Sequence, residues 1–226
     1  MSIKTDGILL DVDGTLWDST GIVSKVWTRA VRENGCPDMT VTAEMLQALF
    51  GRTMDVIAEN LLPELTKAQR DRIMEVCCVY EKQALEQMGA QEDLPEMEPE
   101  ALPACRICYP GVQATIRELS KRVPVFIVSN CQSGYIELFL EKTGLGPYVT
   151  DFECFGDTGK NKGDNIRLLA DRNGLKAPVY VGDTQGDADA AAQAGVPFIY
   201  ASYGFGTADH MDAEISNFAE LITTIG

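Results

Sequence analysis

Short apolar runs alternate with amphipathic stretches over most of this chain. Five of the runs are rich in aliphatic and β-branched residues and have the length of strands. They lie at residues 7–11, 123–129, 150–154, 178–182 and 197–202. Such continuous apolar runs are typical of strands that are buried on both faces, as in a parallel sheet.

Helical periodicity fills the intervals between the later runs. These predicted helices lie at residues 111–121, 135–142, 164–173 and 187–194. The alternation of strands and helices predicts an α/β fold, in which a parallel sheet has helices on both faces. Ligands of such sheets bind beyond the carboxyl ends of the strands, so polar residues at those ends are the candidate site residues.

The first two predicted strands are separated by residues 12–122, which is far more than one crossover helix needs. Four helical patterns follow within this stretch, at residues 22–34, 42–50, 54–61 and 66–88. We therefore predict a small α-helical domain at residues 19–102, inserted into an α/β core domain of residues 1–18 and 103–226. The acidic, proline-containing segment 91–103 is predicted to be a solvated linker.

The composition limits the partners that this protein can have. Its 226 residues include 34 acidic and 19 basic side chains, which gives a net charge of −15. This argues against a nucleic acid or an anionic membrane as partner, because both need a basic surface. No apolar run approaches a membrane span, and the first residues lack the apolar core of a signal peptide. Seven scattered cysteines indicate reduced thiols, so we expect a cytoplasmic protein. The default expectation for its oligomeric state is a monomer, with a homodimer as the alternative.

The first predicted strand ends in two carboxylates within the sequence DVDGT. Asp11 can coordinate a divalent cation with one oxygen and attack an electrophile with the other. Asp13 can act as general acid and then as general base, while its backbone carbonyl also reaches the metal. A carboxylate is a weak nucleophile and needs an activated target, such as a phosphoryl group held by Mg²⁺. Gly14 lets the backbone pass close to the phosphate, and Thr15 offers it a hydroxyl.

Further polar residues follow the next strand and precede a later helix. Ser129 ends the second predicted strand, where its hydroxyl and a donor from Asn130 can bind a phosphoryl group. Lys162 can supply the positive charge that phosphoryl transfer requires. Lys160 is the alternative, but Lys162 lies directly before a predicted helix and is therefore preferred.

Two more carboxylates follow the fourth predicted strand, in the sequence GDTQGD. Asp183 leaves the strand and is the natural third metal ligand. Asp187 can hold a metal-bound water or orient the lysine. Their alternative roles are a helix N-cap and a first-turn helix acid.

In this order, DVDGT, the strand-terminal Ser129, Lys162 and GDTQGD resemble the four motifs of the haloacid dehalogenase superfamily. The chain is most similar to the phosphoglycolate-phosphatase-like subgroup, whose α-helical cap the inserted domain resembles. The resemblance implies a Rossmann-like parallel sheet, dependence on Mg²⁺ and a covalent phosphoaspartate on Asp11. It also implies the acid/base role of Asp13. A small-molecule phosphate ester is then the expected substrate, nominally 2-phosphoglycolate.

Three residues are candidates for substrate specificity. Gly51 and Arg52 lie between two predicted helices, where related caps project a specificity loop over the site. Arg52 can pair with a carboxylate or a second phosphate of the substrate, and an exposed turn arginine is the alternative. Trp17 can either form a wall of the substrate pocket or pack at the hinge.

Two other functions would use similar residues. A phosphomutase of the β-phosphoglucomutase type usually carries a histidine shortly after the nucleophile, and residues 21–25 contain none. A phosphoaspartate receiver, which is a switch without turnover, has its acidic pair before the acceptor strand and has no inserted cap. Repeated turnover of a phosphate ester would distinguish a phosphatase from such a switch.

Overall fold

A six-stranded parallel sheet forms the centre of the computed structural model, which describes residues 2–87 and 105–226. Its strand order is β3-β2-β1-β4-β5-β6. The strands are β1 (Gly7–Leu10), β2 (Val125–Ser129), β3 (Asp151–Cys154), β4 (Pro178–Gly182), β5 (Phe198–Ala201) and β6 (Ala213–Ile215). In the middle of the sheet, β1 pairs with β2 on one side and with β4 on the other. The carboxyl ends of these three strands therefore lie together.

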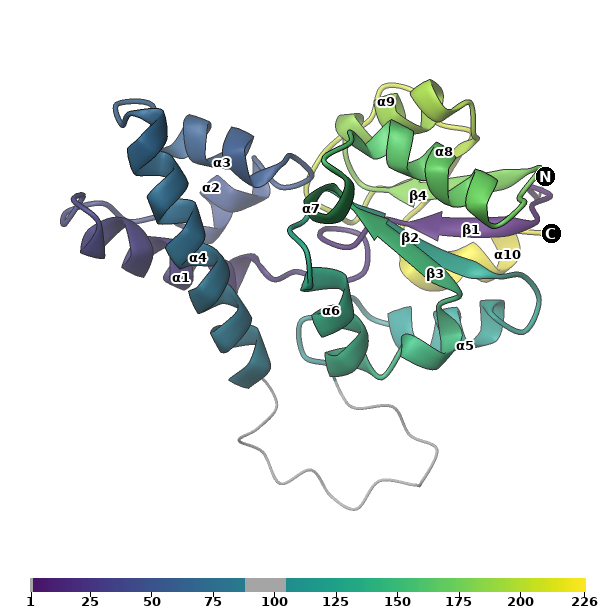
Figure 1. The fold of residues 1–226 in the computed structure, drawn as a ribbon. Helices are drawn as coiled ribbons and strands as arrows, with labels where there is room; N and C mark the ends of the chain where they lie inside the picture. Colours follow the sequence, from purple (N-terminus) through teal and green to yellow (C-terminus); the bar gives the residue numbers. More distant parts are fainter. Residues whose placement is uncertain (1, 88–104) are drawn as a thin grey trace, which may run out of the picture.

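Helices cover both faces of the sheet, as Figure 1 shows. One face carries α5 (Val112–Leu119), α6 (Tyr135–Thr143) and α10 (Leu221–Thr224), and the other carries α8 (Lys162–Arg172) and α9 (Gln185–Ala194). A short helix, α7 (Phe155–Thr158), follows β3. β1, β2 and β4 are buried along their whole length, with one apolar cluster on each face of the sheet. The predicted α/β fold with helices on both faces is confirmed.

A helical insertion follows β1 and lies at the carboxyl ends of the strands (Figure 1). It consists of α1 (Thr20–Glu33), α2 (Ala43–Gln47), α3 (Met54–Leu61) and α4 (Lys67–Gln87). These helices share an apolar cluster of their own, which includes the buried side chains of Trp27, Ile57 and Ile73. The predicted insertion is thus confirmed. Its division from the core domain at residues 18 and 102 remains a prediction, and the second boundary and the linker 91–103 lie outside the described residues.

The sequence pattern missed one strand. β6 pairs in parallel with β5, but it has only three residues, and Glu214 at its centre is exposed. Such a short edge strand has too few apolar residues for its periodicity to be recognised. Within the described ranges, no helix combines the length and the apolar character that a membrane crossing requires.

Candidate active site

Asp11 and Lys162 meet at the carboxyl end of β1. Asp11 directly follows the strand and is buried, and the Nζ atom of Lys162 donates to Asp11 Oδ1 at 2.9 Å and to Asp187 Oδ1 at 2.6 Å. Lys162 opens α8, whose N-cap is Asn161, so the start of the helix sets its position. Burial opposes the charge of Lys162, but its two carboxylate partners outweigh this and raise its pKa. Lys160 is exposed, so the structure places Lys162, and not Lys160, in the site.

Asp183 lies beside the DVDGT loop at the end of β4. Its Oδ2 atom accepts a hydrogen bond from the Phe205 backbone N–H at 2.7 Å, and its Oδ1 atom accepts one from the Thr15 hydroxyl at 3.3 Å. Gly14 adopts a φ of 86°, and a Cβ atom there would lie 2.1 Å from Asp183 Oδ2. Glycine therefore lets the loop pass against the Asp183 carboxylate. The Thr15 hydroxyl is directed to Asp183.

Asp187 has the two roles that its sequence position suggested. It is the third residue of α9 and forms a capping box with Thr184, whose hydroxyl donates to Asp187 Oδ2 at 2.6 Å. Its other oxygen accepts from Lys162 and from the Tyr180 hydroxyl, which lies at 3.2 Å. Asp187 is therefore both a first-turn helix acid and the group that orients Lys162.

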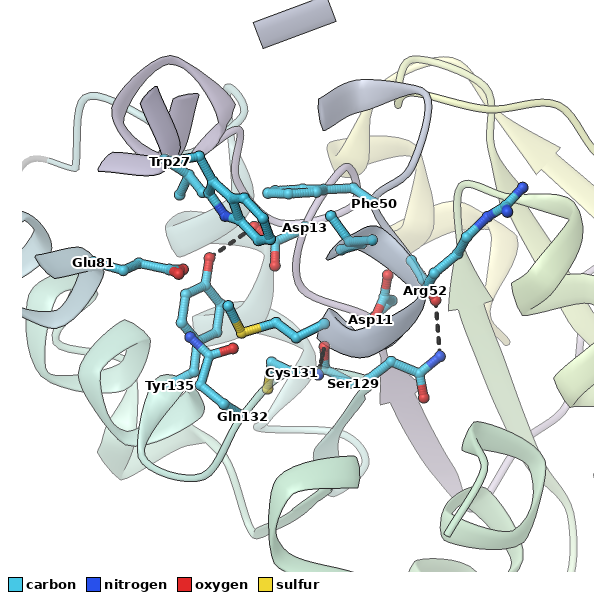
Figure 2. A pocket seen from close by; sticks show the side chains of 15 residues that line it. Asp11, Asp13, Trp27, Phe50, Arg52, Glu81, Ser129, Cys131, Gln132 and Tyr135 are labelled. Carbon is cyan, nitrogen blue, oxygen red and sulfur yellow. Dashed lines mark hydrogen bonds between the residues drawn. The ribbon is translucent and has the colours of Figure 1, made fainter. Parts of the chain in front are cut away.

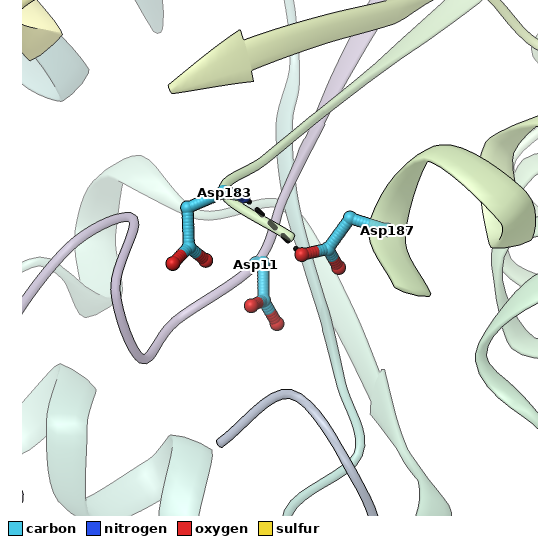
Figure 3. Close-up of side chains that lie close together, drawn as sticks. All are labelled: Asp11, Asp183 and Asp187. Carbon is cyan, nitrogen blue, oxygen red and sulfur yellow. Dashed lines mark hydrogen bonds between the residues drawn. The ribbon is translucent and has the colours of Figure 1, made fainter. Parts of the chain in front are cut away.

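These three aspartates form one buried acidic cluster, drawn in Figure 3. Each has a carboxylate oxygen within 4.8 Å of the other two. Burial raises the pKa of Asp11 to about 7, although Lys162 opposes this, and burial with the repulsion of Asp187 and Asp11 raises the pKa of Asp183 well above its ordinary value. Asp11 Oδ2 is buried and has no hydrogen-bond partner within residues 2–87 and 105–226. Three buried carboxylates against one lysine leave negative charge uncompensated, and hard oxygen ligands suit a divalent cation. The cluster therefore fits a divalent metal ion.

Asp13 is held by three donors on a single oxygen. The Trp17 indole, the Ser19 hydroxyl and the Tyr135 hydroxyl lie 2.9, 2.7 and 2.8 Å from Asp13 Oδ1. These bonds fix the carboxylate in one orientation, and they leave Oδ2 as the oxygen that can serve a substrate. Burial raises the pKa of Asp13 to about 6, although the three donors oppose the shift. Asp13 is thus able to hold a proton close to neutral pH.

A cavity lies between the sheet edge and the helical insertion (Figure 2). It has about 500 Å³ of empty space, including the part that is open to solvent. Asp11, Asp13 and Ser129 line it from the sheet side. The insertion contributes apolar side chains, with Trp27 and Phe50 visible above Asp13 in Figure 2. The nucleophile and acid candidates therefore face the same cavity.

Two contacts hold the insertion against the sheet domain at this cavity. The Asn130 side chain donates from Nδ2 to the Gly51 carbonyl oxygen at 2.8 Å. The rings of Phe50 and Phe205 meet edge to face at a centroid distance of 6.0 Å. Gly51 is thus placed beside the phosphate-binding candidate Asn130, across the gap between the two parts of the chain.

The two remaining specificity candidates are placed differently. Arg52 lines the cavity but is exposed, and in Figure 2 its guanidinium points away from Asp11 and Asp13. Trp17 does not line the cavity. It is fully buried, packs edge to face on Tyr135 and Phe139, and orients Asp13 through its indole N–H.

Sequence reasoning missed the groups that support the aspartates and one cavity carboxyl. Ser19 and Tyr135 hold Asp13, and Tyr180 holds Asp187. Tyr135 is 122 residues from Asp13, and no local pattern connects residues at that separation. Ser19 and Tyr180 are close to their partners in the chain, but neither pair lies within one helix or strand, so no helix or strand period places the side chains together.

Glu81 on α4 also lines the cavity. The sequence does contain a signal for Glu81: it follows Ile73 and Cys77 and precedes Leu85 at intervals of four residues, the spacing of one buried helix face.

A family model described as haloacid dehalogenase-like hydrolase matches residues 8–201 of the chain. The chain belongs to this family. The match covers β1, the helical insertion and the strands up to β5, and so includes every aspartate of the acidic cluster. The predicted membership and the assignment as a hydrolase are therefore confirmed. Members of this family typically need a divalent metal, which agrees with the cluster of Asp11, Asp183 and Asp187.

Several family members of similar length are phosphoglycolate phosphatases. The protein of that name from Photorhabdus laumondii is 26 % identical, over 97 % of this chain and 92 % of its own. The Escherichia coli K12 protein of that name is 26 % identical, over 91 % of this chain and 84 % of its own. A crystal structure of a predicted phosphoglycolate phosphatase from Haemophilus somnus superposes with a TM-score of 0.78 at 19 % identity and covers 96 % of both chains. This structural likeness shows that the fold is shared.

Proposed function

We propose that this family member is a Mg²⁺-dependent phosphatase that hydrolyses a small phosphate monoester through an aspartyl-phosphate intermediate on Asp11. The observation that carries the proposal is the arrangement of the two DVDGT carboxylates. Both line the same cavity, with Asp11 backed by Lys162 and Asp13 held at one oxygen by three donors. A nucleophile and a proton donor are thus directed at one place.

In the first step, Asp11 attacks the phosphorus atom while the bond from phosphorus to the ester oxygen breaks. Oδ1 of Asp11 is bound to Lys162, so Oδ2, which has no hydrogen-bond partner, is the attacking oxygen. The proton on Asp13 goes to the leaving oxygen, which departs as an alcohol. Ser129 and Asn130 donate hydrogen bonds to the phosphoryl oxygens, and Lys162 offsets the negative charge.

In the second step, Asp13 takes a proton from a water molecule, which attacks the phosphorus atom of the aspartyl-phosphate. The bond between phosphorus and Asp11 breaks, so inorganic phosphate leaves and both carboxylates regain their first states. The raised pKa of Asp13, about 6, suits a group that must donate a proton and then accept one.

Asp11, Asp183 and Asp187 would hold the metal ion, with Asp187 acting directly or through water, and the Asp13 backbone carbonyl would complete the protein ligands. When bound, Mg²⁺ neutralises charge on the phosphoryl oxygens and on the ligands. The clustering of these three buried carboxylates and the raised pKa of Asp183 support a cation at this place.

The helical insertion is the cap that closes over the substrate. Its contacts through Gly51 and Phe50 place apolar side chains over the cavity, which excludes bulk water from the aspartyl-phosphate. 2-Phosphoglycolate is the nominal substrate because it stands in the names of the relatives. Its choice over other small phosphate esters rests on those names alone.

Release of inorganic phosphate from a panel of small phosphate esters, with Mg²⁺ and with chelator, tests the proposal. We expect many turnovers per enzyme with Mg²⁺ and none with chelator. A single turnover followed by a stable phosphoenzyme would instead support the phosphoaspartate switch. Conversion of glucose 1-phosphate without phosphate release would support the phosphomutase. That alternative has no support from the sequence, because residues 21–25 contain no histidine.

A further inference from the structure

Glu81 is a carboxyl at a position where the fold favours an apolar side chain. The buried residues of α4 are Ile73, Cys77, Glu81 and Leu85, at intervals of four, and they form one stripe along the helix. Ile73 and Cys77 pack into the apolar cluster of the insertion, and Leu85 packs into that of the sheet domain. Glu81 lies between them and is only 5 % exposed. Burying a carboxyl here costs free energy that a leucine would not cost, so packing does not explain the residue.

The Glu81 carboxyl faces the cavity and has few polar partners in the described part of the chain. Its side chain lines the cavity and points toward Asp13 and Tyr135 in Figure 2. It has a hydrogen bond with Gln132, which follows β2, and among the described residues it has no ion-pair partner. Burial, together with the negative charge of Asp13, raises the pKa of Glu81 to about 8.

The leaving group of the substrate must lie in this part of the cavity. Its ester oxygen has to contact Asp13, and the carbon skeleton then extends between Asp13 and the walls that the insertion provides. Those walls are apolar side chains, among them Trp27 and Ile57, with Glu81 beside them. Arg52, the cation of the cavity rim, is exposed and points away. A carboxylate on the leaving group would therefore approach Asp13 and Glu81 with no inward-pointing cation among the described residues of the cavity lining.

We propose that Glu81 is a specificity-determining residue that accepts a hydrogen bond from the leaving group, so that the enzyme prefers phosphate esters carrying a hydroxyl or ammonium group over those carrying a carboxylate. This inference rests on the proposed phosphatase function and names the class of its substrate. A hydroxyl or an ammonium group gives the buried Glu81 carboxyl a second donor, beside Gln132. A carboxylate brings a third acidic group into a space where burial and the charge of Asp13 already oppose ionisation of Glu81, and this costs binding free energy.

Three two-carbon phosphate esters that differ only at the far end provide the test. They are 2-hydroxyethyl phosphate, ethanolamine phosphate and 2-phosphoglycolate. The kcat/KM of each is measured for the wild type and for Glu81→Gln and Glu81→Leu. Glu75→Gln is the matched control, because Glu75 is an exposed glutamate on the same helix.

For the wild type we expect kcat/KM for at least one of the two donor-bearing esters to exceed that for 2-phosphoglycolate by about tenfold or more. Glu81→Leu should remove this preference, because it removes the acceptor and fills the apolar stripe. Glu81→Gln keeps an acceptor but cannot ionise. A selective loss with ethanolamine phosphate would therefore identify ammonium as the natural donor, and a retained preference for the hydroxyl ester would identify hydroxyl. Glu75→Gln should leave all ratios unchanged.

Three results would overturn the inference. One is a wild type that hydrolyses 2-phosphoglycolate as well as the other two esters. The second is an equal loss on all three esters in both Glu81 variants, which is what a purely structural contact with Gln132 would give. The third is the absence of hydrolysis of these esters and of p-nitrophenyl phosphate, which would also overturn the proposed phosphatase. Hydrolysis of p-nitrophenyl phosphate with unchanged ester ratios would overturn only the role of Glu81.

Discussion

Replacing Lys162 by methionine should destabilise the metal-free protein and should nearly abolish its activity. The Lys162 side chain is 4 % exposed and bridges two buried carboxylates at 2.9 and 2.6 Å. Removing one partner of a buried ion pair costs about 3–5 kcal/mol, because the other charge is left buried without compensation. Here two carboxylates, Asp11 and Asp187, lose the same partner, so we expect the loss of unfolding free energy to lie at the upper end of this range.

Urea denaturation in EDTA at pH 7.5 measures this loss for Lys162→Met against Lys160→Met. Lys160 lies two residues earlier and is exposed, so its variant should stay within about 0.5 kcal/mol of the wild type. Mg²⁺ should restore part of the lost stability, because a cation bound to the folded state offsets the same carboxylates. The kcat should fall by about 10²-fold or more, since one charged group at the phosphoryl oxygens is lost.

The pH dependence of the variant gives an internal check. The pKa of Asp11 is raised to about 7 even with Lys162 present, so the folded state binds a proton more tightly than the unfolded state does. Stability must then fall as pH rises from about 4 toward 7, and it should fall more steeply without the lysine. A Lys162→Met protein as stable as Lys160→Met at pH 7.5 would refute the reasoning.

Two further variants test other parts of the structure. Gly14→Ala should weaken the apparent affinity for Mg²⁺ in activity titrations, because its Cβ atom would lie 2.1 Å from Asp183 Oδ2. Gly35 is the control: it also has a positive φ, but a Cβ atom there would have no described atom within 4 Å, so Gly35→Ala should leave the affinity unchanged. Glu81→Gln should be more stable than the wild type by a few kcal/mol at pH 8.5 and should differ little from it at pH 4.5. The reason is that the pKa of Glu81 is raised to about 8 in the folded state, so the wild type loses stability as the pH rises between these values. Urea denaturation at both values measures this, and an equal difference at the two would contradict it.

The central strands and the aspartates at their ends were predictable from the sequence. β1, β2 and β4 are buried throughout, and a strand buried on both faces is a continuous apolar run that the sequence shows directly. Once those strands are parallel neighbours, Asp11 and Asp183 must lie at the same edge. The preference for Lys162 over Lys160 also came from local sequence, because Lys162 lies next to the predicted helix at residues 164–173. In the structure the helix begins two residues earlier, at Lys162 itself, with Asn161 as its N-cap.

Other features depend on contacts that local sequence does not encode. Tyr135 and Asp13 are far apart in the chain, and only the packing of α6 against the sheet domain brings them to 2.8 Å. Trp17 is buried away from the cavity because it packs on Tyr135 and Phe139. Glu81 has the four-residue spacing of a buried position, but it was overlooked because a charged residue on a helix is ordinarily solvated. Its burial depends on how the insertion packs against the sheet domain.

The most direct test of the account is to find the phosphorylated residue. The Asp13→Asn variant should form the aspartyl-phosphate but hydrolyse it slowly, because it lacks the base that activates water. Acid quenching of this variant with Mg²⁺ and an ester from the panel, followed by peptide mass spectrometry, should show one phosphoryl group on Asp11 and none in the presence of EDTA. A phosphoryl group on another residue, or full Mg²⁺-dependent turnover by Asp11→Asn, would contradict the mechanism.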